Sequence, residues 1–200
     1  MLDHVFTQLV ASHRRSLEQA LLQRQAIEER FQTDVFLGDM SFETSYSLPG
    51  EARPARIRVD TSFDWPTWSQ TAYRSWSLGE ETEELPEVVV EIAFRVQELA
   101  SAPDPGVLLQ VAPDELILLS GQSLVRGPTT IELVHLEGEA GPMAAIELSY
   151  EGSCQLDESM LENPTDLDQA LAPLGREIAS VLVRIADLPF TFRPPPPEDV

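Results

Sequence analysis

The stretch MSFETSYSLPGEARPARIRVDTSFDW, residues 40–65, decides the fold because its apolar side chains recur at every second position. Phe42 and Tyr46 alternate with polar residues in the first half, and Val59 and Phe63 do so in the second half. A period of two places these side chains on one face of a strand. The joining segment LPGEARP has the Pro-Gly chemistry of a turn. The stretch therefore predicts an antiparallel hairpin with one buried face.

Helical periodicity flanks this hairpin at both ends of the chain. Residues 2–32 predict one long amphipathic helix, because the apolar residues fall close to a heptad spacing at Phe6, Val10, Leu17, Ala20, Ile27 and Phe31. This helix, assigned to an N-terminal segment 1–33, packs either on its own domain or against another subunit. A second helix is predicted from Asp166, with its main part beginning or bending at Pro173 and its end at Pro189.

The segment between the hairpin and the last helix predicts further strands. We expect a third strand near Thr71–Leu78, an acidic loop over GEETEELPE, and a strand from Val88 to Val96. Short apolar segments follow at 107–111, 116–119, 130–136 and 144–150, separated by Gly, Pro and Asp. The order of helix, seven or eight strands, and helix predicts an α+β protein with an antiparallel sheet, on which the C-terminal helix packs. The proline run within 194–200 predicts an extended tail.

The charge is distributed unevenly along the chain. Residues 1–76 carry 10 acidic residues and 8 arginines, whereas residues 77–200 carry 24 acidic residues and 5 arginines, and lysine is absent. A net charge of −21 repels phosphate backbones and anionic lipids, so we expect neither nucleic acid nor membrane as a partner. A single cysteine, the lack of a signal-peptide pattern and the lack of an apolar run of about 18 residues predict a cytoplasmic protein.

No constellation of catalytic or metal-binding residues stands out in the sequence. His4 and His13 are spaced for opposite sides of a helix, and no Cys-x-x-Cys, His-x-x-x-His or Gly-x-Ser-x-Gly pattern occurs. We therefore expect a protein that is not an enzyme and needs no cofactor or metal.

Aromatic residues gather in the segment 63–76, which contains all three tryptophans. Such a cluster either forms cross-strand pairs in a core or captures a ligand or an apolar peptide segment. The candidates for binding are Phe63, Trp65, Trp68, Tyr73 and Trp76.

Four segments resemble the SecB family of export chaperones when they are read in order. They are VFLGDMSFE at 35–43, EVVVEIAF at 87–94, AIELSYEG at 145–152 and, the most specific, LAPLGREIASVLVRIADLP at 171–189. Gly38 replaces the family's usual lysine, and the family's aliphatic–phenylalanine pair is replaced by Ser153 and Cys154. The resemblance covers roughly residues 34–193, within which 99–141 has the character of an insertion. A long N-terminal extension is similar to the SecB-like chaperones associated with toxin–antitoxin systems.

This resemblance implies a cytoplasmic, ATP-independent chaperone with a four-stranded antiparallel sheet and a long helix, which assembles as a dimer or tetramer and binds unfolded polypeptides. The family's acidic contacts to the SecA motor correspond here to Asp39, Glu43 and Glu147. Its positions of oligomer contact correspond to Ile146, Leu148 and Tyr150, which are otherwise ordinary core positions. An antitoxin is the other partner that the resemblance implies.

Two other functions fit the residues. A C-terminal helix packed against a curved antiparallel sheet is also typical of helix-grip domains that bind lipids or small molecules, in which case the segment 63–76 lines a cavity. The third hypothesis is a non-catalytic assembly or adaptor protein of a phage or secretion apparatus, with the N-terminal helix and the acidic half as docking surfaces.

Overall fold

The computed structural model describes residues 2–49, 55–81, 85–119, 121–135, 142–155 and 164–194 of the chain. Its elements in chain order are α1 (Leu2–Leu21), the short helix η1 (Leu22–Arg24), β1 (Ile27–Phe36), β2 (Asp39–Ser47), β3 (Ile57–Trp65), α2 (Thr67–Ser77), β4 (Glu87–Leu99), α3 (Gly106–Leu109), β5 (Glu115–Ile117), β6 (Ser123–Arg126), β7 (Thr130–Val134), β8 (Met143–Gln155) and α5 (Pro164–Ala186). The predicted α+β class is confirmed: one antiparallel sheet is combined with an N-terminal and a C-terminal helix.

The sheet runs in the order β1-β2-β3-β4-β8-β6-β5, and β7 also pairs with β8. The predicted hairpin is confirmed, since β2 and β3 pair antiparallel with Phe42 opposite Phe63. Phe63 in turn lies opposite Val90 of β4, so the apolar positions of neighbouring strands share one face. Four neighbouring strands, β2, β3, β4 and β8, form the centre of a sheet that is wider than the four strands implied by the resemblance.

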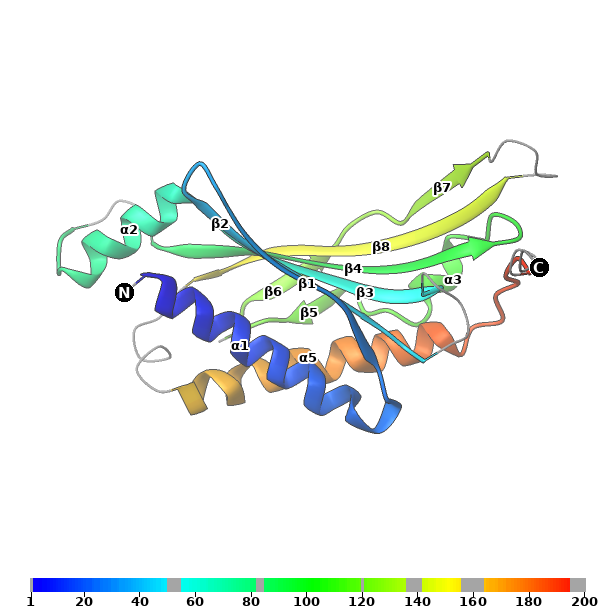
Figure 1. Cartoon of the computed structure of the whole chain (residues 1–200), viewed down its shortest axis with the longest axis horizontal. Coiled ribbons are helices and arrows are strands. Elements are labelled where there is room, and N and C mark those ends of the chain that lie inside the picture. The colour runs from blue at the N-terminus through cyan, green and yellow to red at the C-terminus, as the bar shows by residue number, and fades with distance from the viewer. Residues whose placement is uncertain are drawn as a thin grey trace, which may run out of the picture.

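Both long helices cover the same face of this sheet, while no helix of the described residues lies on the opposite face (Figure 1). The covered face is apolar and fully buried along β4 and β8, where Ile92, Phe94 and Leu148 lie among the core residues. On the helix side, Leu9 and Leu17 of α1 complete the core, together with the buried apolar side chains of α5. The apolar side chains of the strands and those of the two helices thus pack together in one core layer between sheet and helices.

His13 of α1 is a member of this buried layer. It has no exposed surface, its ring packs edge-on against Phe63 with 4.8 Å between centroids, and neither ring nitrogen has a hydrogen-bond partner among the described residues. Burial lowers the pKa of His13 to about 3, so the imidazole is a neutral core group.

The prediction of one helix over residues 2–32 is wrong in its second half. The helix ends at Leu21, Gln25 adopts a left-handed φ of 54°, and residues from Ile27 form strand β1. Ile27 and Phe31 are four residues apart, a spacing typical of one face of a helix. In the strand, a bulge between Glu28 and Arg30 shifts the register, so that Ile27 pairs with Ser47 and Phe31 with Thr44 and the two side chains lie on opposite faces. Pairing with β2 decides in favour of the strand.

The predicted strand near Thr71–Leu78 is also wrong, because this segment is part of helix α2. The helix buries Ser69, Gln70 and Tyr73, which is a helical spacing. Its first turn is stabilised from a distant segment: Asp39 accepts hydrogen bonds from the Thr67 amide at 2.6 Å and from the Thr67 hydroxyl at 2.7 Å.

The later segments follow the prediction more closely. Val88–Val96 lies in β4, and 116–119, 130–136 and 144–150 overlap β5, β7 and β8, but 107–111 overlaps the short helix α3. Helix α5 begins at Pro164, contains Pro173 within its length, and ends at Ala186 before Pro189. Residues 50–54 of the predicted turn, part of the acidic loop, and 195–200 of the tail lie outside the described residues.

Candidate functional site

The aromatic residues proposed to bind clients divide into buried and exposed groups. Phe63 and Trp65 have no exposed surface, and Tyr73 is buried beside Trp65 with 5.7 Å between ring centroids. The Trp65 indole donates a hydrogen bond to Ser69 Oγ at 3.1 Å. Trp76 is half-buried, and only Trp68 on α2 presents an exposed ring. The structure therefore places three of these five residues in the core, where a client cannot reach them.

The residues assigned to oligomer contacts also lie inside the protomer. Ile146, Leu148 and Tyr150 on β8 have no exposed surface. The Tyr150 hydroxyl donates a hydrogen bond to the Pro113 carbonyl oxygen at 2.7 Å. Side chains without exposed surface cannot contact a second subunit directly, so these positions act in this structure as core residues.

The three carboxylates assigned to a basic partner are separated by the fold. Asp39 lies at the start of β2, where hydrogen bonds from the Thr67 hydroxyl and amide hold the pKa of its carboxyl below the usual value. Glu43 and Glu147 lie instead on the face of the sheet that carries no helix. Asp39 therefore stabilises α2, and the other two belong to a common surface.

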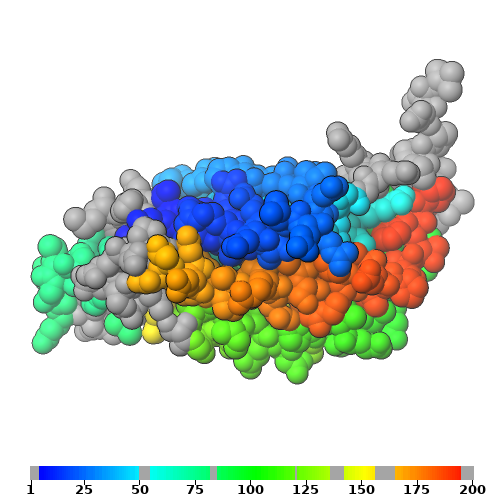
Figure 2. Space-filling view, turned by 90° about the horizontal axis from the view of Figure 1, so that it is seen from below, coloured from blue at the N-terminus to red at the C-terminus, as the bar shows by residue number. Residues whose placement is uncertain are grey.

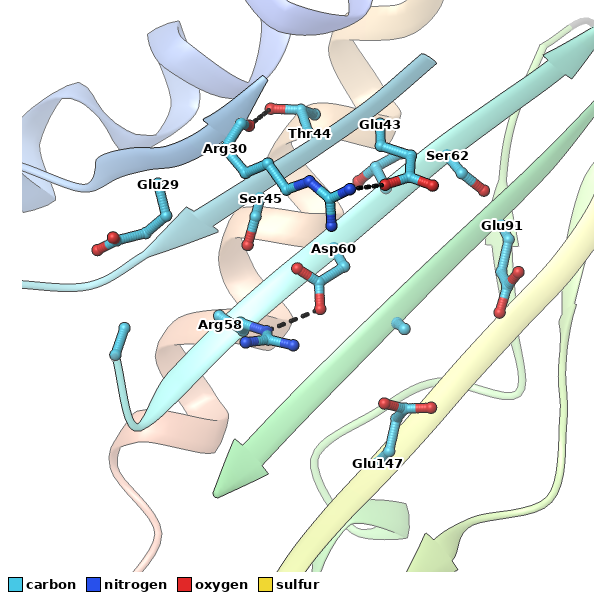
Figure 3. A pocket seen from close by; sticks show the side chains of 13 residues that line it. Glu29, Arg30, Glu43, Thr44, Ser45, Arg58, Asp60, Ser62, Glu91 and Glu147 are labelled. Atoms are coloured by element: carbon cyan, nitrogen blue, oxygen red, sulfur yellow. Dashed lines mark hydrogen bonds and ion pairs between the residues drawn. The ribbon is translucent and has the colours of Figure 1, made fainter. Parts of the chain in front are cut away.

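That surface contains a cavity of about 420 Å³, which we call the sheet groove. Five strands contribute to it, as Figure 3 shows for most of its side chains. The lining residues are Glu29, Arg30, Glu43, Thr44, Ser45, Ala55, Arg58, Asp60, Thr61, Ser62, Glu91, Ala93 and Glu147. Small side chains form its floor, and charged side chains, mostly acidic, stand around it.

Ion pairs account for only part of this charge. Arg30 pairs with Glu43 at 3.0 Å and Arg58 with Asp60 at 2.8 Å, both inside the groove (Figure 3). Arg95 pairs with Glu147 at 3.0 Å at its border. Glu91 has no ion-pair partner among the described residues.

Two carboxyl groups of this face, those of Glu91 and Asp64, have raised pKa values. Burial raises the pKa of Glu91, and the nearby charges of Glu151 and Glu147 raise it further. Burial likewise raises the pKa of Asp64, with Glu43 as the largest charge contribution. Glu91 lies directly opposite Glu151 in the register of β4 and β8. The face is thus a place where a positively charged group would relieve repulsion.

The hairpin formed by β1 and β2 presents apolar side chains at the edge of the same sheet. Leu37 and Phe36 at its tip are 87% and 74% exposed, and Val35 and Phe31 are exposed along β1. The tight turn has positive φ at both Leu37 (52°) and Gly38 (94°), a conformation for which glycine is suited and leucine is not. A contiguous exposed apolar surface of this kind is typical of an interaction site.

Sequence reasoning missed this hairpin because residues 27–32 of β1 were included in the predicted N-terminal helix, and because the resemblance treats 35–43 as one strand, which the turn at Leu37 and Gly38 divides. One signal was present: Val35, Phe36 and Leu37 precede a glycine, as expected for a strand that ends in a tight turn. The exposure of these side chains depends on β1 being an edge strand, which sequence periodicity does not show.

Two further properties of the described part of the chain bear on the site. It contains no group of three or more His, Cys, Asp or Glu side chains arranged to hold a metal ion. None of its helices is both long enough and apolar enough to span a membrane.

Comparisons with known proteins complete the description of the site. No protein-family model, no curated protein and no solved structure matches the chain.

Proposed function

We propose that this protein is an ATP-independent, cytoplasmic chaperone of the SecB type that binds unfolded polypeptides. One observation carries the proposal: an uncovered, acidic sheet groove shares its sheet with an exposed apolar edge hairpin. Unfolded chains present basic and apolar segments together. Negative charge favours their encounter with the sheet groove, and apolar contacts slow their release.

The arrangement of the resembling segments supports the same proposal. Strands β2, β4 and β8, which contain much of three of them, lie within the four central strands of the sheet, and α5, which contains most of the fourth, covers the sheet from one side. On this proposal Glu43 and Glu147 contact a basic segment of a partner such as the SecA motor or an antitoxin. Asp39 is assigned to the stability of α2 instead.

The helix-grip alternative receives less support from the packing. It needs a cavity between sheet and helix that is lined by the aromatic segment. Phe63 and Trp65 fill that layer, with Phe6 of α1 stacked on Trp65 at 6.0 Å between ring centroids.

The proposal is tested by the aggregation of several guanidinium-denatured proteins, diluted into buffer with an equimolar amount of this protein and followed by light scattering. We expect the wild type to suppress scattering. The double variant Phe36→Thr with Leu37→Asn should lose at least about half of this effect, because it removes the apolar tip while asparagine tolerates the left-handed turn.

A matched control replaces an exposed apolar pair on another strand, Leu133→Thr with Val134→Thr on β7. This variant should suppress scattering as well as the wild type. Unchanged aggregation of every client with the wild type would exclude a holdase. Equal losses in both double variants would show that the hairpin is not the site.

A further inference from the structure

A second concave surface lies on the opposite side of the molecule, between the end of α1 with η1 and the middle of α5. Its volume is about 610 Å³, and we call it the helix groove. The two helices lie side by side on this side of the molecule, as Figure 2 shows in blue and orange. This surface is independent of the sheet groove, since the two share no lining residue.

The helix groove adjoins a very close helix contact. A Cβ atom added at Gly175 of α5 would lie 2.8 Å from the backbone of Ser16 of α1, so only glycine allows this approach. Ser16 is the first lining residue on α1, and the groove continues from it toward the carboxyl ends of both helices. The groove is therefore built by a backbone contact and does not depend on how one surface side chain is placed.

Three arginines stand around the helix groove: Arg24 on η1, and Arg176 and Arg184 on α5. None of the described residues that line it is acidic, although the chain carries 34 acidic residues and 13 arginines. Arg184 pairs with Glu177 at 3.1 Å. The exposed guanidinium groups of Arg24 and Arg176 have no hydrogen-bond or ion-pair partner within the described residues. The positive charge of Arg24 and Arg176, which is unpaired within the described residues, points to a negatively charged occupant.

The floor of the helix groove is apolar and made of small side chains. Ala20 of α1 and Ala172, Ala179 and Val183 of α5 line it, and the exposed Leu22 stands at its edge. Along α5 the lining extends from Ala172 to Arg184, which is about 18 Å at 1.5 Å per residue. Small side chains let a third helix approach closely, so the groove has room for about three helical turns.

We infer that the helix groove docks an acidic amphipathic helix of a partner protein. Its apolar side chains pack on the alanine floor, and its carboxylates pair with Arg24 and Arg176. A second copy of the chain placed symmetrically on this groove would bring arginine against arginine, and the charged backbone of a nucleic acid offers no apolar helical face to pack on the alanine floor. An acidic amphipathic helix is complementary both to the positive charge of the helix groove and to its apolar floor.

The probe is a fluorescein-labelled synthetic peptide of about 15 residues, with leucine and alanine on one helical face and glutamate on both flanks. Fluorescence anisotropy against the full-length protein should show saturable binding. A peptide with glutamine at every glutamate position should bind at least about tenfold more weakly, because charge-assisted hydrogen bonds are lost.

The double variant Arg24→Glu with Arg176→Glu should weaken binding of the acidic peptide at least about tenfold. Arg74→Glu, at another exposed arginine on α2, is the control for a change of charge far from the groove and should leave the Kd unchanged. If the double variant fails to fold by circular dichroism, Arg24→Gln with Arg176→Gln replaces it. Equal binding of both peptides, equal binding by the folded variants and the wild type, or no binding by the wild type would each overturn the inference.

Discussion

The two grooves of this protein have opposite character. The sheet groove is lined by Glu29, Glu43, Asp60, Glu91 and Glu147 with two arginines, whereas the helix groove is lined by three arginines and no acidic residue. Along the sequence, the charge instead separates a nearly neutral first part from an acidic second part. The helix groove takes Arg24 from the first part and Arg176 with Arg184 from the second. Charge that is segregated along the chain is thus redistributed by the fold into faces.

The largest effect is expected from a change in the core layer that lies between the sheet and the two helices and so separates the two grooves. Phe63→Ala should lower the free energy of unfolding by about 3–5 kcal/mol, because the ring is fully buried against Phe42 and His13. Urea unfolding measures this effect. The matched variant Trp68→Ala, on the exposed ring of α2, should cost far less. Similar costs at both positions would mean that Phe63 is a surface residue and that the described layer is wrong.

A narrower test reshapes the helix groove and leaves the sheet groove intact. Gly175→Ala should cost about 1–3 kcal/mol, because the new methyl group would lie 2.5 Å from Ser16 Oγ and 2.8 Å from its backbone. Without this clash, alanine would stabilise a helix relative to glycine. Thermal and urea unfolding give the sign, and Gly175→Ala with the same or higher stability than the wild type would rule out the close contact.

The smallest effect is expected from the charge of the sheet groove. Glu91→Gln should stabilise the protein by about 0.2–1 kcal/mol at neutral pH, because burial disfavours the charge of Glu91 and Glu151 faces it directly across the strands. The folded state raises the pKa of Glu91, so the native protein holds this proton more tightly and the ionised group costs stability as pH rises. The advantage of glutamine should therefore shrink as pH falls below the pKa of the folded state.

Urea unfolding at neutral and at acidic pH measures this difference. Glu115→Gln, an exposed position on β5, is the matched control and should leave stability nearly unchanged at both values. A gain for Glu91→Gln that persists undiminished at acidic pH would show that repulsion between carboxylates is not its cause.

Sequence periodicity predicted much of the fold. The hairpin of β2 and β3, the strand β4 and the helix α5 were expected, because each combines a clear period with a buried face. Local spacing was misleading at β1 and α2: a four-residue spacing in β1 suggested a helix, and a strand was expected at Thr71–Leu78 although the buried residues of α2 follow a helical spacing. Contacts with other segments stabilise the observed structures: β1 pairs with β2, and Asp39 accepts hydrogen bonds from the first turn of α2.

The candidate site was predicted less well than the fold. Glu43 and Glu147 were named and do lie on one uncovered face, but the aromatic candidates are mostly buried and the apolar hairpin was missed. Whether an apolar residue is core or contact surface depends on which strand is the edge of the sheet. That property belongs to the order of the strands and is not encoded in the period of any one segment.

By itself the sequence determined the fold class, the apolar face of most strands, and a net charge that repels other polyanions, since these follow from local spacing and composition. Only the tertiary structure decided which face of the sheet stays uncovered and where the apolar hairpin protrudes. It alone gathered three arginines from two distant segments around one groove. The physical reason is that exposure and local electrostatic potential depend on contacts between residues far apart along the chain, which the close approach at Gly175 and the pairing of β1 with β2 create.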